Sequence, residues 1–154
     1  MTVLQKSRQS PGAREDAPLP VKIKLAALWT STMFLYAYAD IQHFVLQPGS
    51  LQDIQQGTLE GITLGQPFLL GAAVLMTIPA LMIVLSVVLR AAIVRPLSLL
   101  VGGAFTLITL GTVVMPGETW WFYWLFNLVE VILTISIVVL AWSWPRTSPD
   151  STTR

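Results

Sequence analysis

The chain has 154 residues, of which 54% are hydrophobic and only 11% charged, against roughly 25% charged residues in an ordinary soluble domain. A chain this short cannot bury so many apolar side chains in one globular core, so we expect lipid to cover them. The net charge is +1, with one histidine and no cysteine. This composition excludes a basic nucleic-acid-binding face, disulfides and thiol chemistry, and it gives no reason to expect a cofactor or a metal.

In chain order, the sequence predicts a disordered cytoplasmic tail over residues 1–20, a helical membrane domain over 21–145, and a second disordered cytoplasmic tail over 146–154. A bilayer core of about 30 Å needs about 20 helical residues, and lipid cannot satisfy the polar groups of an open sheet. The fold class is therefore all-α, an integral membrane four-helix bundle. Its four predicted spans are residues 25–46, 67–90, 97–115 and 120–143, separated by Pro48-Gly49, the segment 90–96 and Pro116-Gly117.

The basic residues predict the orientation of these spans. All nine Lys and Arg residues lie before the first span, between the second and third, or after the fourth. The positive-inside rule then places both termini in the cytoplasm. The predicted location is a multi-pass protein of the plasma (inner) membrane of a bacterium, with the lipid bilayer as its surroundings.

The loop over residues 47–66 faces the outer side in this topology. The sequence "SLQD" at 50–53 is typical of a helix start in which Ser50 and Asp53 cap each other. Gly57 is a plausible stop, so we expect a short helix on the outer surface.

One alternative concerns the first span. The sequence "AYAD" at 37–40 is similar to the cleavage site of a secretory signal, and basic residues precede the apolar stretch. Against this reading, the basic leader is long and "IQHFVL" continues the apolar run beyond the site. The intact mass of the mature protein decides between the two.

Polar residues form a stripe along the predicted first and fourth spans. At 3.6 residues per turn, each set falls on one face of its helix; the candidates for ligand binding or proton transfer are Thr32, Tyr36, Asp40, His43, Tyr123, Asn127, Glu130 and Thr134. A charge near the middle of a span costs about 2.5–3.5 kcal/mol. Each stripe is therefore expected to face the bundle interior.

If the first and fourth spans are neighbours, their stripes meet. With a rise of 1.5 Å per residue, Asp40 and Asn127 lie about 10 Å below the outer edge, and Tyr36 and Glu130 about 15 Å. We expect Tyr36 to donate its hydroxyl to Glu130, and His43 or Asn127 to partner Asp40. The alternative is that these residues only hold helices together, at about 0.6 kcal/mol each.

The two middle spans differ in kind. Pro79 in the second span predicts a kink near Leu75, because proline removes a helical hydrogen bond and clashes one turn back. The third span carries Gly102, Gly103 and Gly111. Small residues let helices approach closely, so we expect this to be the tightly packed helix, with no chemistry of its own.

Three stretches carry a family resemblance: "KIKLAALWTSTMFLYAYAD", "GQPFLLGAAVLMTIPALMIVLS" and "NLVEVILTISIVVLAWSWP". They resemble an uncharacterised family of small bacterial four-span membrane proteins, a domain of unknown function. The recurring features correspond to residues 24–29, 36–40, Ile78-Pro79 and Glu130. This resemblance covers about residues 21–145 and implies the topology but no activity. The chain is also similar to DoxX-type four-helix proteins, in size only.

Three functions remain open. The leading one is a non-enzymatic membrane protein that binds a small amphipathic ligand or a partner subunit through the cluster between the first and fourth spans. The second is a proton-coupled small-molecule transporter acting as a homodimer, with Glu130 as the proton carrier. The third is a membrane-embedded enzyme, for which the sequence offers no nucleophile, metal set or cofactor fingerprint.

Overall fold

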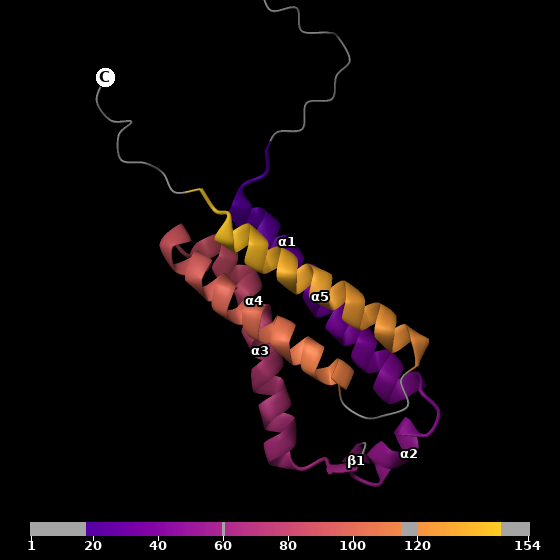
Figure 1. Ribbon diagram of the computed structural model, residues 1–154. Coiled ribbons are helices and arrows are strands. Elements are labelled where there is room, and N and C mark those ends of the chain that lie inside the picture. The colour runs from indigo at the N-terminus through magenta and orange to yellow at the C-terminus, as the bar shows by residue number, and fades with distance from the viewer. Residues whose placement is uncertain (1–17, 60, 115–119, 146–154) are drawn as a thin grey trace, which may run out of the picture.

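Figure 1 shows the computed structural model, which describes residues 18–59, 61–114 and 120–145. The described chain is mostly helical, as the sequence predicts. The long helices are α1 (Val21–Ile41), α3 (Gln66–Val88), α4 (Ala91–Val114) and α5 (Trp121–Trp142). Short elements follow α1: the π-helical turn η1 (Gln42–Leu46), α2 (Ser50–Gln55), and the strands β1 (Thr58–Leu59) and β2 (Ile62–Thr63). The predicted tails and Pro116-Gly117 lie outside the described residues, apart from 18–20 of the first tail.

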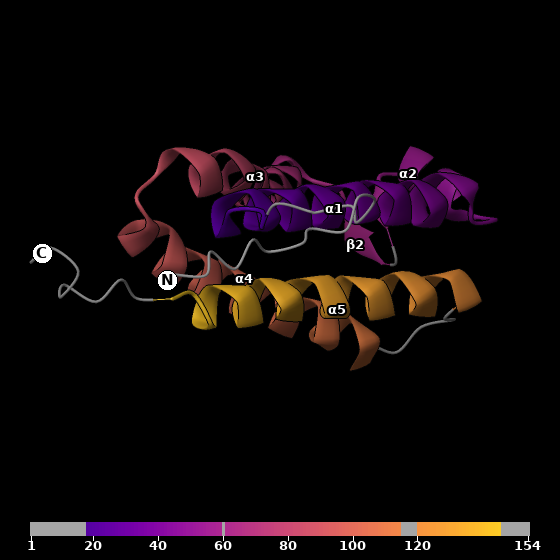
Figure 2. The ribbon, with the colours of Figure 1, turned by 90° about the horizontal axis from the view of Figure 1, so that it is seen from above.

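The long helices pack in two pairs. α1 lies beside α3, and α4 lies beside α5. Seen from above, these pairs form two layers (Figure 2). α1 also packs along α5, whereas α3 and α4 touch much less. The first and fourth of the long helices are therefore neighbours, which the sequence left open.

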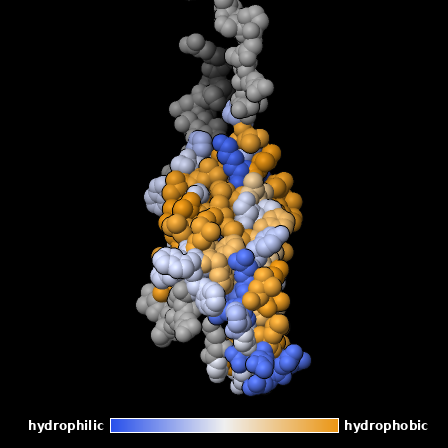
Figure 3. Space-filling view, turned by 90° about the vertical axis from the view of Figure 1, so that its right-hand side faces the viewer, coloured by the Kyte–Doolittle hydropathy of each residue, from blue (hydrophilic) through white to orange (hydrophobic). Residues whose placement is uncertain are grey.

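Three of these helices are long and apolar enough to cross a membrane: α3, α4 and α5. α1 has a similar length but carries Lys22, Lys24 and Asp40, and these charges lower its mean hydropathy. Apolar side chains cover much of the face shown in Figure 3, and hydrophilic ones gather at its lower end, where α2 lies in Figure 1. A fold of this kind is compatible with a membrane protein.

Two predicted boundaries are wrong. α1 begins at Val21, four residues before the predicted span, and its last five predicted residues form η1. α4 begins at Ala91, so Pro96, which the sequence marked as a separator, lies inside the helix. A proline in the second turn leaves one carbonyl without its donor, and a helix end can satisfy that carbonyl with water. The real separator is the short turn at Leu89 and Arg90.

The outer loop contains the predicted short helix, but a different residue starts it. Gly49, with φ of 93°, is the N-cap of α2, and its carbonyl accepts from the backbone N–H groups of Gln52 and Asp53. No side chain caps this helix, so the predicted reciprocal cap between Ser50 and Asp53 is wrong. Gly57 follows the helix with φ of 78°, a conformation that favours glycine. β1 and β2 then form a small antiparallel hairpin that the sequence did not predict.

The core lies where α1, α4 and α5 meet. Leu25, Trp29, Val94, Phe105 and Ile137 are buried there. At Gly102 in α4, an added Cβ would lie 3.1 Å from Val138 and 3.2 Å from Ile137 of α5. The predicted close approach is thus confirmed at Gly102, while an added Cβ at Gly103 or Gly111 would meet nothing within 4 Å.

α3 is packed along only part of its length. Residues 66–74 are all exposed, and buried positions begin only after Leu75, with Pro79, Met82 and Ser86 facing the other helices. This change from exposed to buried positions occurs near Leu75, where the sequence predicts a kink. The first two turns of α3 therefore present an apolar surface on every side.

Candidate functional site

Polar side chains from three helices meet near the end of the bundle that carries α2. We call this group the polar cluster; its members are Tyr36 and Asp40 of α1, His43 of η1, Thr109 and Thr112 of α4, and Tyr123, Asn127 and Glu130 of α5. The helical spacing predicted from the sequence brings the α1 and α5 members together, because the two helices pack side by side. The threonines of α4 were not expected there.

Tyr36 has a different partner from the one predicted. Its hydroxyl forms a hydrogen bond of 3.2 Å with the hydroxyl of Thr109, and its ring lies 6.0 Å from that of Phe105. Both partners are on α4, so Tyr36 links the first helix to the third. Tyr36 and Glu130 are still near enough to interact electrostatically. The predicted hydrogen bond between them is wrong: the tyrosine hydroxyl is bonded to Thr109 instead.

Glu130 is the most deeply placed acidic group of the cluster. Its side chain is only 5% exposed, and its carboxyl makes no hydrogen bond to any residue that the structure describes. The carboxyl of Asp40 interacts with it electrostatically. A carboxyl with so little access to water and no donor is costly, since the hydration that it loses is not replaced by a hydrogen bond.

Asp40 lies at the exposed edge of the cluster. Its side chain is exposed, so the expectation that the whole stripe of α1 faces the interior is wrong at this position. Asp40 interacts electrostatically with both Glu130 and His43. The His43 ring lies 4.8 Å from Phe44 and 6.1 Å from Tyr123. The two carboxyls thus form a pair with one member exposed and the other buried.

Asn127 is fully engaged by its neighbours. The Thr112 hydroxyl donates to Asn127 Oδ1 at 3.1 Å, and Asn127 Nδ2 donates to the backbone carbonyl of Tyr123 at 3.0 Å. Asn127 therefore holds α4 to α5 and is not the partner of Asp40. Its side chain is 6% exposed, nearly as buried as Glu130 one turn away.

The two remaining predicted residues are satisfied within their own helices. The Thr32 hydroxyl donates to the carbonyl of Leu28 at 2.9 Å, and the Thr134 hydroxyl donates to that of Glu130 at 2.9 Å. Both side chains are fully buried. Such bonds to the preceding turn remove the cost of burial without creating a site.

Sequence reasoning missed Thr109 and Thr112, having assigned no chemistry to the third span. A signal was present: Val101, Phe105, Thr109 and Thr112 follow one another at intervals of three or four residues, so they share a helix face. Two of these four residues are apolar, so the pattern is also typical of a helix face that only packs against other helices. The pairing with Tyr36 and Asn127 depends on which helices are neighbours, which one sequence does not show.

The charged groups of the cluster are mostly acidic. It contains two carboxyls and one histidine, and none of its members is a Lys or Arg. Within the described ranges, no three His, Cys, Asp or Glu side chains are grouped closely enough to hold a metal ion. Chemically, this arrangement suits a hydrogen-bond donor or a positive charge.

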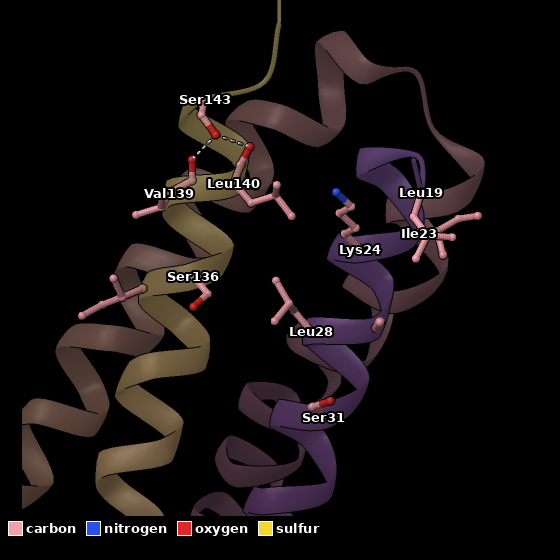
Figure 4. Close-up of a pocket in the computed structure, with 11 residues that line it drawn as sticks. Leu19, Ile23, Lys24, Leu28, Ser31, Ser136, Val139, Leu140 and Ser143 are labelled. Atoms are coloured by element: carbon pink, nitrogen blue, oxygen red, sulfur yellow. Dashed lines mark hydrogen bonds between the residues drawn. The ribbon is translucent and has the colours of Figure 1, made fainter. Parts of the chain in front are cut away.

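A groove lies elsewhere on the same helix pair, at the opposite end from α2. Its volume is about 650 Å³. Side chains from the start of α1 and the end of α5 line it, among them Lys24, Ser31, Ser136 and Ser143 (Figure 4). The groove and the polar cluster are thus two separate features of the α1–α5 contact.

Comparison with protein families gives one match. A model described as "Family of unknown function (DUF6326)" matches residues 20–151. Neither the curated proteins nor the solved structures gave a match. The matched region includes all four long helices and the two carboxyls, Asp40 and Glu130. It nearly coincides with residues 21–145, over which the sequence resembles an uncharacterised family. The chain belongs to this family of unknown function, DUF6326.

Proposed function

We propose that the chain is an integral membrane protein whose four long helices cross the bilayer with both termini in the cytoplasm. α1 is the least apolar of the four, but its polar-stripe residue Thr32 and the neighbouring Trp29 are fully buried within the protein. Lys22, Lys24 and Arg95 lie at the end of the helices opposite α2, which agrees with the positive-inside rule.

The basic residues at that end also support the helices. Lys22 Nζ donates to the carbonyl of Leu89, just past the end of α3. Arg95 Nε donates to the carbonyl of Ala141 at 3.1 Å, and Arg95 Nη2 donates to that of Trp142 at 3.3 Å, in the last turn of α5. Cations are favourable at helix C-termini, where carbonyls lack partners. These contacts suit an end of the bundle that faces the headgroups.

Within this membrane domain, we propose that the polar cluster binds a small amphipathic ligand whose head group is an amine. The observation that carries this proposal is the buried Glu130 carboxyl, which accepts no hydrogen bond from any described residue. A protonated amine would supply both the missing donors and a positive charge between Glu130 and Asp40. The apolar surroundings in the bundle would accommodate the hydrocarbon part of the ligand.

Thermal unfolding of the detergent-purified full chain tests this function, with decylamine as the probe and decanol as its uncharged counterpart. Decylamine should raise the melting temperature of wild type more than decanol does. Glu130→Gln should lose that difference, while Asp53→Asn should keep it. Asp53→Asn removes one negative charge from the exposed surface of α2, which carries no member of the cluster. Equal effects of the two probes on wild type would refute amine binding.

A second candidate function is proton-coupled transport by a homodimer. The favouring observation is the pairing of an exposed Asp40 with a buried Glu130, which offers a route for a proton from the outer surface to the bundle interior. In vesicles loaded with a pH-sensitive dye, decylamine-dependent proton movement should occur with wild type and Asp53→Asn. Glu130→Gln should abolish it. Proton movement that is unchanged in Glu130→Gln would exclude this route.

A further inference from the structure

The groove between the start of α1 and the end of α5 has a mixed lining. Most of it is apolar, from residues such as Ile23, Leu28, Val139 and Leu140. Ile23 is 48% exposed and Val139 is 58% exposed, so the groove opens on the outside of the bundle. In a membrane-spanning chain this outside is lipid.

One charged side chain enters this apolar groove. Figure 4 shows Lys24 projecting from α1 into the space between α1 and α5. Lys22 and Arg95 at the same end of the bundle donate to helix carbonyls. The ammonium group of Lys24, in contrast, forms no hydrogen bond or ion pair with any residue in the described ranges. Its positive charge is available to a ligand that lies in the groove.

The length of the groove matches one leaflet of a bilayer. Along α1 it runs from Ile23 to Ser31, and along α5 from Ile135 to Ser143. Eight residues of helix correspond to about 12 Å, against about 15 Å for half of the hydrocarbon core. Lys24 lies in the first turn of α1, at the end of the groove where the proposed orientation puts the headgroups of the inner leaflet. The apolar part then lies at the depth of the acyl chains.

Small side chains on both walls make the space. Ala27 and Ser31 on α1 face Ser136 and Ser143 on α5. The hydroxyls of Ser136 and Ser143 donate to carbonyls of their own helix, at 2.6 Å to Ile132 and 2.8 Å to Val139. They present little polarity to the groove, which therefore suits a hydrocarbon chain.

From this charge, depth and lining, we infer that the groove binds one anionic phospholipid of the inner leaflet, with its acyl chain along α1 and α5 and its phosphate at Lys24. The inference uses the proposed membrane orientation but not the ligand proposed for the polar cluster. A lysine near a membrane surface contributes about 1 kcal/mol to the attraction of anionic lipid, or roughly fivefold in affinity.

Native mass spectrometry of the full chain tests the inference. The protein is equilibrated with mixed micelles that contain equal amounts of phosphatidylglycerol and phosphatidylcholine with identical acyl chains. Wild type should retain phosphatidylglycerol about fivefold more than phosphatidylcholine. Lys24→Gln should remove that preference. The matched control is Arg90→Gln, which removes an equal charge from the exposed turn between α3 and α4 and should keep the preference.

A second variant fills the groove without touching the charge. Ser136→Phe should reduce the retention of both lipids, because the ring occupies the space for the acyl chain. Glu130→Gln should retain lipid like wild type, so failure of this inference and failure of the amine proposal remain distinguishable. The inference is overturned if Lys24→Gln prefers phosphatidylglycerol as strongly as wild type does. It is also overturned if Arg90→Gln loses this preference as fully as Lys24→Gln does. Retention of neither lipid by wild type also overturns it, in favour of a chain tail or a second copy as the occupant.

Discussion

Tyr36 and Thr109 join the first and third long helices through a single hydrogen bond, 3.2 Å between their hydroxyl oxygens. The two residues are 73 positions apart in the chain. Thr109 is 3% exposed, so its hydroxyl is shielded from water. The tyrosine ring lies near that of Phe105 on the same helix as Thr109, and its hydroxyl is bonded to Thr109 and not to Glu130.

The first prediction concerns this bond. Tyr36→Phe and Thr109→Val should each destabilise the protein by roughly 0.6 kcal/mol, the average for hydrogen bonds between membrane helices. The double variant should lose little more than either single variant, because the two changes remove the same bond. Denaturation of the four proteins in detergent measures the coupling. Fully additive losses would contradict a direct bond.

The second prediction uses two adjacent glycines in α4. Gly102→Leu should destabilise the protein by about 1–3 kcal/mol, the usual range for overpacking, because a Cβ at Gly102 already presses on Ile137 and Val138. Gly103→Leu should be tolerated, since nothing lies within 4 Å of its Cβ position. Thermal unfolding of both variants gives the comparison. Similar melting temperatures for the two would mean that α4 and α5 do not approach at Gly102.

Much of the fold could be predicted from the sequence, because long apolar runs are a strong helical signal. Apolar runs of helical length leave little choice but helices, and the predicted spans overlap the four long helices. The exact ends were less predictable. Pro96 marks a boundary by its chemistry, yet near a helix start its missing N–H is easily tolerated. The π-helical turn after Ile41 and the small hairpin had no clear sequence signal.

The polar cluster could be predicted only in part. Helical periodicity places Tyr36, Asn127 and Glu130 on the right faces of their helices. The actual partners depend on the rotation of each helix and on which helices are neighbours. The Tyr36 hydroxyl is bonded to Thr109. Comparing the positions of residues along their helices could not predict this partner.

The third prediction concerns topology. A reporter fused after Arg154 should show cytoplasmic activity, and one inserted beside Gln56 in the loop after α2 should show external activity, because all nine basic residues lie on one side of the four proposed spans. Paired alkaline phosphatase and green fluorescent protein fusions at both sites provide the measurement. An external signal from the C-terminal fusion would contradict four spans.

The last prediction compares two buried polar residues of α5. Asn127 and Glu130 are 6% and 5% exposed, but only Asn127 has described partners for its side chain, Thr112 and the carbonyl of Tyr123. Asn127→Leu should therefore destabilise the protein, by roughly 0.6 kcal/mol for each lost bond. Glu130→Leu should leave stability unchanged or raise it, because leucine is favourable at the middle of a span.

This contrast also bears on function. A residue whose buried side chain makes no described hydrogen bond is typical of a functional site, where activity is maintained at the expense of stability. Melting temperatures of wild type, Asn127→Leu and Glu130→Leu in ligand-free detergent provide the test. If Glu130→Leu melts as far below wild type as Asn127→Leu does, then the Glu130 carboxyl has a structural partner. In that case Glu130 is part of the packing between helices, and the argument for a ligand at the polar cluster fails.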